Sequence, residues 1–192
     1  MKATTNTINT KGITHLRKET YGAAFAKEMR EELKRRGAKG VTVRINRRGY
    51  TDSLTITVKM SPEDYATIAE AAERYSLAQF LCDWDRRGIY FGGRWHDPKS
   101  AYNLPHEERE RAHKQFLADA IGQARDFANH HYNDRDYHWE FSQSGYERLR
   151  DIYRIAAQWN WDKSDPMTDY FDVGYYLNIN VRAPEGFAPA EN

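Results

Sequence analysis

The sequence contains one cysteine, Cys82, and no long hydrophobic run. A single cysteine cannot form an internal disulfide and cannot supply a zinc site of four thiolates, so a reducing cytoplasm is the natural compartment. The longest apolar runs are only a few residues, whereas a membrane-spanning helix needs roughly 20. The beginning of the chain also lacks the apolar segment of a secretion signal. We therefore expect a cytoplasmic protein with no disulfide and no membrane segment.

The sequence motifs of common catalytic sites are missing as well. The glycines of residues 88–95 are not accompanied by the lysine and hydroxyl residue of a phosphate-binding loop. No two of the seven histidines are four residues apart, the spacing at which a helix presents a zinc-binding pair. We identify no catalytic residue and expect no cofactor, and a non-enzymatic protein is the preferred interpretation.

Charge is unevenly distributed along the chain, although the net charge is only +1. Residues 1–60 carry 14 Lys and Arg against 5 Asp and Glu, whereas residues 61–192 carry 15 against 23, so their net charges are +9 and −8. Such asymmetry is typical of a basic surface that meets a polyanion, or of two oppositely charged parts of one fold that meet each other. Basic and acidic faces that simply contact solvent are the third interpretation.

Hydrophobic periodicity predicts both helices and strands. Apolar residues recur every three or four positions in four segments, which indicates amphipathic helices. They alternate with polar residues in three other segments, which indicates half-buried strands. The predicted helices are residues 21–36, 62–75, 106–128 and 144–159, and the predicted strands are residues 41–46, 53–60 and 173–182.

These elements predict an α+β fold, and a chain of 192 residues corresponds to one domain. The first two strands form a hairpin, and the strand at 173–182 completes a small antiparallel sheet with helices packed on one face. We expect a mostly helical, aromatic-rich insertion at about residues 76–142. The expected organisation is a flexible leader at 1–12, one domain at 13–182 and a flexible tail at 183–192.

The predicted sheet has a second face that no helix covers. If the apolar residues of all three strands point toward the helices, strand alternation places the intervening residues together on the opposite face. The residues expected on this open face are Thr42, Arg44, Asn46, Ser53, Thr55, Thr57, Lys59, Tyr176, Asn178, Asn180 and Arg182.

Positive charge concentrates on the hairpin of this sheet. Cationic side chains attract phosphates, and aromatic rings beside them stack on bases, which is the combination used to bind single strands. The candidate nucleic-acid-binding residues are Arg44, Arg47, Arg48, Tyr50, Lys59, Tyr176 and Arg182. The alternative is that these cations pair with the acidic part of the fold or protect the hairpin edge from unwanted strand pairing.

Two segments resemble a known protein family. The segments FAKEMREELKRRGAKGVTVRINRRGYTDSLTITV and NWDKSDPMTDYFDVGYYLNINV are similar to the large polyvalent protein associated domain, type 29, of phage and conjugative-element proteins. The resemblance covers roughly residues 18–75 and 143–182. Its more specific part is a signature formed by Asn160, Asp162, Ser164, Asp165, Thr168, Asp169, Tyr170, Phe171 and Asp172.

The resemblance implies a module of proteins that enter a new host with the DNA of a mobile element and protect that DNA from host defences. It implies no assigned reaction and no catalytic residue. We therefore expect an accessory protein in the host cytoplasm, acting in counter-defence or establishment by stoichiometric binding to a host or defence-system protein. Nucleic-acid binding is the alternative function. The oligomeric state is not predicted.

The Asp-rich segment 162–172 suggests a further and less favoured alternative, a metal-dependent enzyme. Mg²⁺ and Ca²⁺ prefer oxygen ligands, and the candidate ligands are Asp162, Asp165 and Asp169. However, their spacing is not that of a calcium-binding loop. The preferred interpretation is that Asn160, Asp162 and Ser164 end the helix and cap turns through local side-chain to backbone bonds. Asp169 and Asp172 would pair with basic residues of the hairpin, so we expect no metal.

Aromatic residues are frequent in the predicted insertion. Aromatic side chains dominate the hot spots of protein interfaces. The candidate partner-binding residues are Trp84, Tyr90, Trp95, Tyr137 and Trp139. The alternative, which we prefer, is that they form a satellite core packed over the domain.

Overall fold

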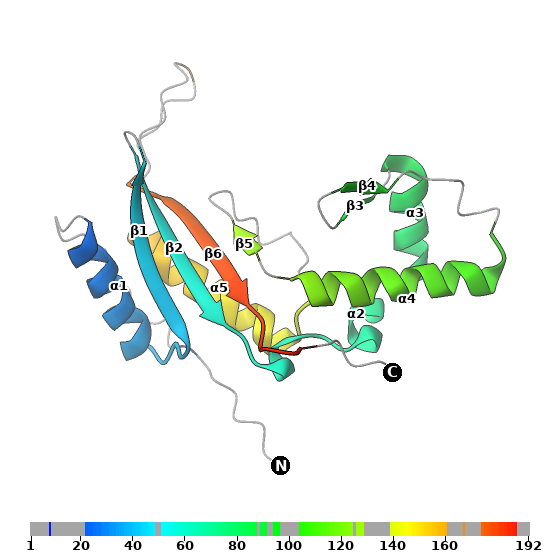
Figure 1. Ribbon diagram of the computed structural model, residues 1–192, viewed down its shortest axis with the longest axis horizontal. Helices are drawn as coiled ribbons and strands as arrows, with labels where there is room; N and C mark the ends of the chain where they lie inside the picture. The colour runs from blue at the N-terminus through cyan, green and yellow to red at the C-terminus, as the bar shows by residue number, and fades with distance from the viewer. Residues whose placement is uncertain are drawn as a thin grey trace, which may run out of the picture. The chain divides into compact units, whose positions relative to one another are not determined.

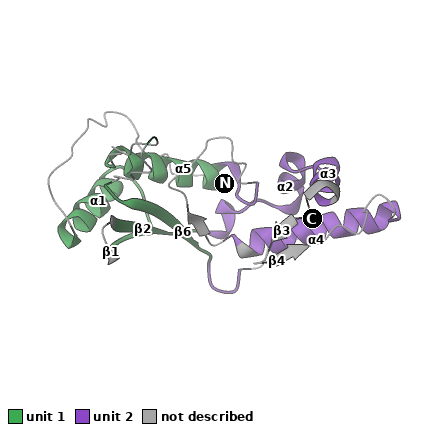
Figure 2. Ribbon diagram, turned by 90° about the horizontal axis from the view of Figure 1, so that it is seen from above, with its two compact units in different colours: residues 1–60, 125–133, 144–183 green, residues 61–124, 134–143, 184–192 purple. Residues whose placement is uncertain are grey.

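The protein is described from a computed structural model. It describes residues 8, 22–48, 51–87, 89–91, 94–96, 104–124, 126–128, 139–160, 167 and 174–187. The chain forms two compact units, shown in Figure 2. Unit 1 comprises residues 1–60, 125–133 and 144–183, and unit 2 comprises residues 61–124, 134–143 and 184–192. Unit 2 therefore begins before the insertion expected at residues 76–142, and it includes part of the tail expected at 183–192.

Unit 1 contains a four-stranded mixed sheet with the strand order β1-β2-β6-β5 (Figure 1). Its strands are β1 (Val41–Arg48), β2 (Thr51–Lys59), β5 (Asp126–Ala128) and β6 (Tyr176–Arg182). The predicted antiparallel hairpin of β1 and β2 is confirmed. The prediction that the C-terminal strand completes an antiparallel sheet is wrong, because β6 runs parallel to β2. A parallel neighbour requires a crossover, and here helix α5 (Gln143–Gln158) precedes β6 in the chain.

The α+β prediction is confirmed, with one face of this sheet covered by helices. The central row of the sheet joins Val43, Ile56 and Ile179, none of which is more than 1% exposed. Figure 2 shows α5 and α1 (Ala23–Arg35) on the same side of β1, β2 and β6. Between the helices, the ring of Phe25 lies 5.8 Å from that of Trp159. The buried face of the sheet and the helix stripes therefore form the core of unit 1.

One arginine of α5 holds the connection into β1 against the end of β2. The Arg148 Nη2 atom donates hydrogen bonds to the carbonyl oxygens of Lys39, at 2.6 Å, and Lys59, at 3.2 Å. Between them, Gly40 has a φ of 64°, and a Cβ atom there would lie 3.3 Å from the Lys59 carbonyl oxygen. A side chain at position 40 would therefore be both strained and crowded.

Unit 2 is mostly helical. Its described elements are a 3-10 helix (Pro62–Asp64), α2 (Ile68–Arg74), α3 (Leu77–Arg87), β3 (Ile89–Phe91), β4 (Arg94–His96) and α4 (His106–Gln123). The helix predicted over 62–75 is interrupted, because Tyr65 forms a β-bridge with Phe141 and a second capping box begins at Thr67. Helix α4 ends at Gln123, and the last predicted helical residues lie in β5 instead.

An aromatic cluster forms the core of unit 2. The Tyr75 ring stacks on Trp139, with 5.1 Å between the ring centroids and 13° between the planes. Phe80 is 1% exposed and packs against Phe116 at 5.3 Å. His113 is also buried, and its Nε2 atom lies 2.8 Å from the Tyr75 carbonyl oxygen. Because a carbonyl can only accept, Nε2 carries the proton and donates it.

The stability of unit 2 is expected to depend on pH through His113. Burial lowers the pKa of His113 below its usual value of 6.5, so protonation is easier in the unfolded chain. The contribution of neutral, buried His113 to the free energy of unfolding is therefore fully present above about pH 6.5. It declines as the pH falls toward the lowered pKa. Urea unfolding followed by the near-ultraviolet circular dichroism of the aromatic cluster should show lower stability at about pH 5 than at about pH 7.5.

The controls use two histidines of α4. His113→Leu should remove part of this acid destabilisation, whereas His106→Leu, at an exposed position of the same helix, should leave it unchanged. An identical pH dependence in the wild type and in His113→Leu would contradict the prediction.

Candidate nucleic-acid interface

The strand register places all eleven residues predicted for the open face on one side of the unit 1 sheet. Residues that pair across neighbouring strands point to the same face. Four rows result, and they are Asn46–Ser53–Tyr176, Arg44–Thr55–Asn178, Thr42–Thr57–Asn180 and Lys59–Arg182. Most of the alternate residues of the same strands are buried, and they are Val43, Leu54, Ile56, Val58, Leu177, Ile179 and Val181. The prediction of the open face from the sequence is therefore confirmed, although β6 runs in the direction opposite to that expected.

The open face is basic. Arg44, Lys59 and Arg182 are exposed, and Arg48 occupies the same register side as Arg44 at the end of β1. No Asp or Glu occupies an open-face position of β1, β2 or β6. Asp126, opposite Asn180 on the edge strand β5, is the acidic residue at an open-face register position. Three of the four described strands of this face therefore carry only cationic and neutral residues.

Tyr176 provides an exposed ring on this face. The residue is 37% exposed at the first position of β6. In the next row, the Asn178 amide donates a hydrogen bond of 2.8 Å to the Ser53 hydroxyl, which fixes the side chain between two strands. Because strands rise about 3.3 Å per residue, Tyr176 and Arg182 stand roughly 20 Å apart along β6. Asn178 and Asn180 lie between them on the same face.

The other predicted nucleic-acid-binding residues are only partly described. The backbone of Arg47 lies in β1 opposite Asp52, on the register side of Val43 and Ile45, so Arg47 does not share the open face. The side chains of Arg47 and Arg48, and the whole of Tyr50, lie outside the described residues. Four of the seven candidates are therefore brought together with described side chains, and they are Arg44, Lys59, Tyr176 and Arg182.

The first residue of the family signature has a structural role. The Asn160 amide nitrogen donates to the Tyr175 carbonyl oxygen at 2.9 Å, and the Tyr175 backbone nitrogen donates to the Asn160 amide oxygen at 3.0 Å. The Tyr175 hydroxyl in turn donates to the Ala156 carbonyl oxygen in α5. Asn160 thus joins the end of α5 to the residue before β6. The other signature residues lie outside the described residues.

The predicted metal ligands do not lie in the described part of the fold. The candidate ligands Asp162, Asp165 and Asp169 fall outside the described residues. Within the residues that are described, no group of three or more His, Cys, Asp or Glu side chains could hold a metal ion. A metal-dependent enzyme and the absence of a metal both stay predictions.

Of the five aromatic residues predicted to contact a partner, two have described side chains, and they are Trp84 and Trp139. Trp139 stacks on Tyr75, and Trp84 packs 5.2 Å from Phe80, so both contribute to the aromatic cluster of unit 2. Both are half-buried, as the satellite-core interpretation predicts. The backbones of Tyr90 and Trp95 are paired between β3 and β4, but their side chains, like the whole of Tyr137, lie outside the described residues.

Comparison of this chain with family models, curated proteins and solved structures finds no match. The resemblance to the polyvalent protein domain therefore stays a prediction. Among the helices described in units 1 and 2, none has the length and apolar character needed to cross a membrane.

Proposed function

We propose that the protein binds single-stranded nucleic acid through the open face of the unit 1 sheet. The observation that carries this proposal is the composition of that face, which presents exposed cations and an exposed tyrosine and to which β1, β2 and β6 contribute no carboxylate. Phosphate neutralisation by such cations supplies sequence-independent affinity.

The position of the ring favours a single strand over a duplex. Bases in a duplex are stacked on one another and hide their faces, whereas unpaired bases can stack on an exposed side chain. Tyr176 supplies that side chain, and one stacked base contributes about 1–3 kcal/mol. The asparagines that follow Tyr176 along β6 can contact bases or sugars, while Arg182 and Lys59 meet phosphates at the far end.

The expectation of a host or defence-system protein as partner rests on the resemblance and is a separate proposal. Counter-defence and establishment are roles that a nucleic-acid-binding protein can also serve. Oligonucleotide binding can be measured whichever of these roles the protein serves.

Replacing Arg44 and Arg182 by Glu is expected to weaken binding of a labelled oligonucleotide by at least about tenfold at about 50 mM salt. Two lost phosphate contacts should also reduce the slope of log affinity against log salt by about 1.4 for single strands. Fluorescence anisotropy with single-stranded DNA, RNA and duplex DNA at about 50 and 200 mM salt measures both effects. Tyr176→Leu should weaken the single-strand complex and leave the salt slope unchanged.

The matched control is the double substitution Lys27→Glu and Lys34→Glu in α1. Both lysines are exposed in unit 1, and the change in net charge is the same. The proposal fails if no binding is detected at low salt, or if the control weakens binding as much as the open-face variant does.

A further inference from the structure

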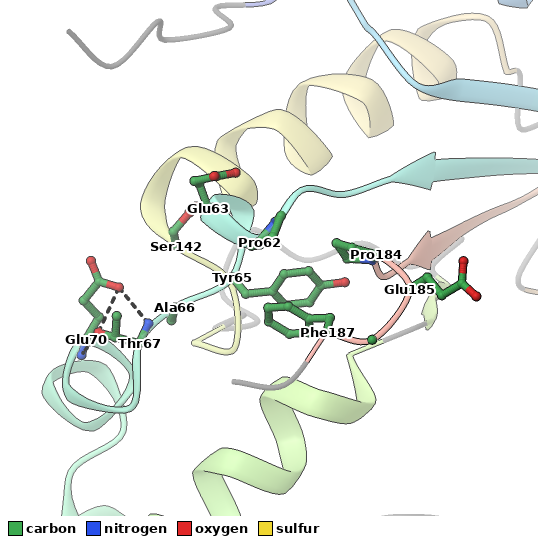
Figure 3. A pocket seen from close by; sticks show the side chains of 11 residues that line it. Pro62, Glu63, Tyr65, Ala66, Thr67, Glu70, Ser142, Pro184, Glu185 and Phe187 are labelled. Carbon is green, nitrogen blue, oxygen red and sulfur yellow. Dashed lines mark hydrogen bonds between the residues drawn. The ribbon is translucent and has the colours of Figure 1, made fainter. Parts of the chain in front are cut away.

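Unit 2 contains a hollow of about 620 Å³, which is separate from the open sheet face. Figure 3 shows it between the start of the 3-10 helix, the segment leading into α2 and the turn that follows β6. All lining residues belong to unit 2. The volume falls within the range of about 300–1,000 Å³ that is usual for small ligands or side chains of a partner.

Hydrogen bonds hold the segments that line the hollow. The Ser142 hydroxyl donates to the Glu63 carbonyl oxygen at 2.8 Å, and the Ser142 backbone nitrogen donates to the Asp64 carbonyl oxygen at 3.0 Å. On the other side, the Phe187 nitrogen donates to the Pro184 carbonyl oxygen at 3.2 Å and closes a turn. Gly186 has a φ of 71° in this turn, a conformation suited to glycine. The hollow is therefore formed before any ligand arrives.

Aromatic and proline rings supply its apolar surface. The ring of Phe187 lies 4.4 Å from that of Tyr65, which is buried and packs on Phe141 at 5.6 Å. Pro62 and Pro184 line the same hollow, as Figure 3 shows. Phe187 is only half-buried and is thus the ring that a ligand can contact.

The charged side chains described in the lining are all acidic. Among the described residues that line the hollow, three are glutamates, namely Glu63, Glu70 and Glu185, and none is Lys, Arg or His. Glu70 accepts hydrogen bonds from Thr67 within the α2 capping box, whereas Glu63 and Glu185 are exposed. Hydrogen bonds from its own backbone nitrogen and from Ser61 lower the pKa of Glu63, so this carboxylate is ionised at neutral pH.

We propose that this hollow is a docking site for a basic peptide segment of a partner protein. Lys and Arg combine an apolar stem with a cationic head, so one side chain can cover Phe187 and the prolines while its charge reaches Glu63 or Glu185. A guanidinium over the Phe187 ring adds a cation–π interaction. The surrounding carboxylates repel polyanions, so this site and the open sheet face would bind ligands of opposite charge.

The probe for this site is a fluorescein-labelled octa-arginine peptide, with an octa-glutamine peptide as the uncharged comparison. The double variant Glu63→Gln and Glu185→Gln should weaken binding of the arginine peptide by about fivefold, the effect of losing two exposed ion pairs. Phe187→Leu should weaken it further while keeping an apolar side chain. Circular dichroism spectra and melting curves establish that each variant folds.

The matched control is Glu107→Gln with Glu108→Gln, which removes the same charge from exposed positions of α4 outside the hollow. This control should bind like the wild type. Three outcomes would overturn the proposal, namely no binding of the arginine peptide, equal loss in the control, and equal affinity for the glutamine peptide. Displacement of the peptide by spermine at equally low concentration would also overturn it, in favour of a polyamine.

Discussion

Replacement of Ile56 by Ala is expected to reduce the free energy of unfolding of unit 1 by about 2–5 kcal/mol. Ile56 is completely buried and pairs with Val43 on one side and Ile179 on the other, so it lies in the central row of the sheet beneath the helices. Removing its methyl groups leaves a cavity, because packed neighbours relax only partly. Amide hydrogen exchange in β1, β2 and β6 measures this loss for unit 1 separately from unit 2.

The next residue in the strand provides the control. Thr57 lies on the open face of β2 and is half-buried, so Thr57→Ala should change the stability by no more than about 0.5 kcal/mol. The pair of variants therefore tests which face of the sheet is the core. Equal effects at the two positions would mean that the alternation of buried and open residues is not as described.

Replacement of Asn160 by Ala is expected to destabilise unit 1 by about 2–3 kcal/mol. The side chain makes two hydrogen bonds to the backbone of Tyr175, and both lie in a partly buried environment. Alanine would leave the Tyr175 nitrogen and carbonyl oxygen without these partners, and burial of such groups is costly. The measurement is hydrogen exchange in the last turn of α5 and at the start of β6, where the largest loss of protection should occur.

Two further substitutions make this prediction specific. Asn160→Asp keeps an acceptor for the Tyr175 nitrogen but places a carboxylate oxygen opposite the Tyr175 carbonyl, so it should not restore stability at neutral pH. Gln158→Ala, at an exposed position near the end of α5, should have an effect below about 0.5 kcal/mol. A loss below that limit for Asn160→Ala would contradict the structural role of this signature residue.

The contacts of Asn160 also bear on how the signature at residues 160–172 should be interpreted. A polar signature next to a strand suggests ligand binding or catalysis, and the Asp-rich segment suggested a metal. For Asn160, the structure instead shows an amide that joins two backbone segments fifteen residues apart. The sequence predicted local bonds from this side chain to the backbone at the end of a helix; the bonds found are to the backbone, but they reach a residue fifteen positions along the chain.

Strand periodicity alone was sufficient to predict the open face. An alternation of two residues assigns each side chain of a strand to one face, whatever the direction of its neighbour. Arg44, Lys59, Tyr176 and Arg182 were therefore predicted on the correct face even though β6 was expected to be antiparallel to β2. The candidate nucleic-acid interface follows from this local property.

Contacts between residues distant in sequence determined the direction of β6, the boundaries of the helices and the hollow of unit 2. Tyr65 fits the predicted helical stripe, but its bridge to Phe141 replaces helical hydrogen bonds at that point. Helix α3 falls within the insertion expected to be mostly helical, but its bounds were not predicted, since the aromatic residues around it show no sustained period in the sequence. The lining of the hollow combines the 3-10 helix with Ser142 and Phe187, which no local pattern relates.

The sequence by itself determined the α+β class, the buried stripes of the helices and the two faces of the strands, because these depend on the spacing of apolar residues within one element. The tertiary structure decided that β6 pairs parallel to β2, that Asn160 holds Tyr175, and that three glutamates line the same hollow as Phe187. Each of these is a contact between segments whose separate sequences are compatible with several partners. The choice among partners is made by the packing of the whole fold.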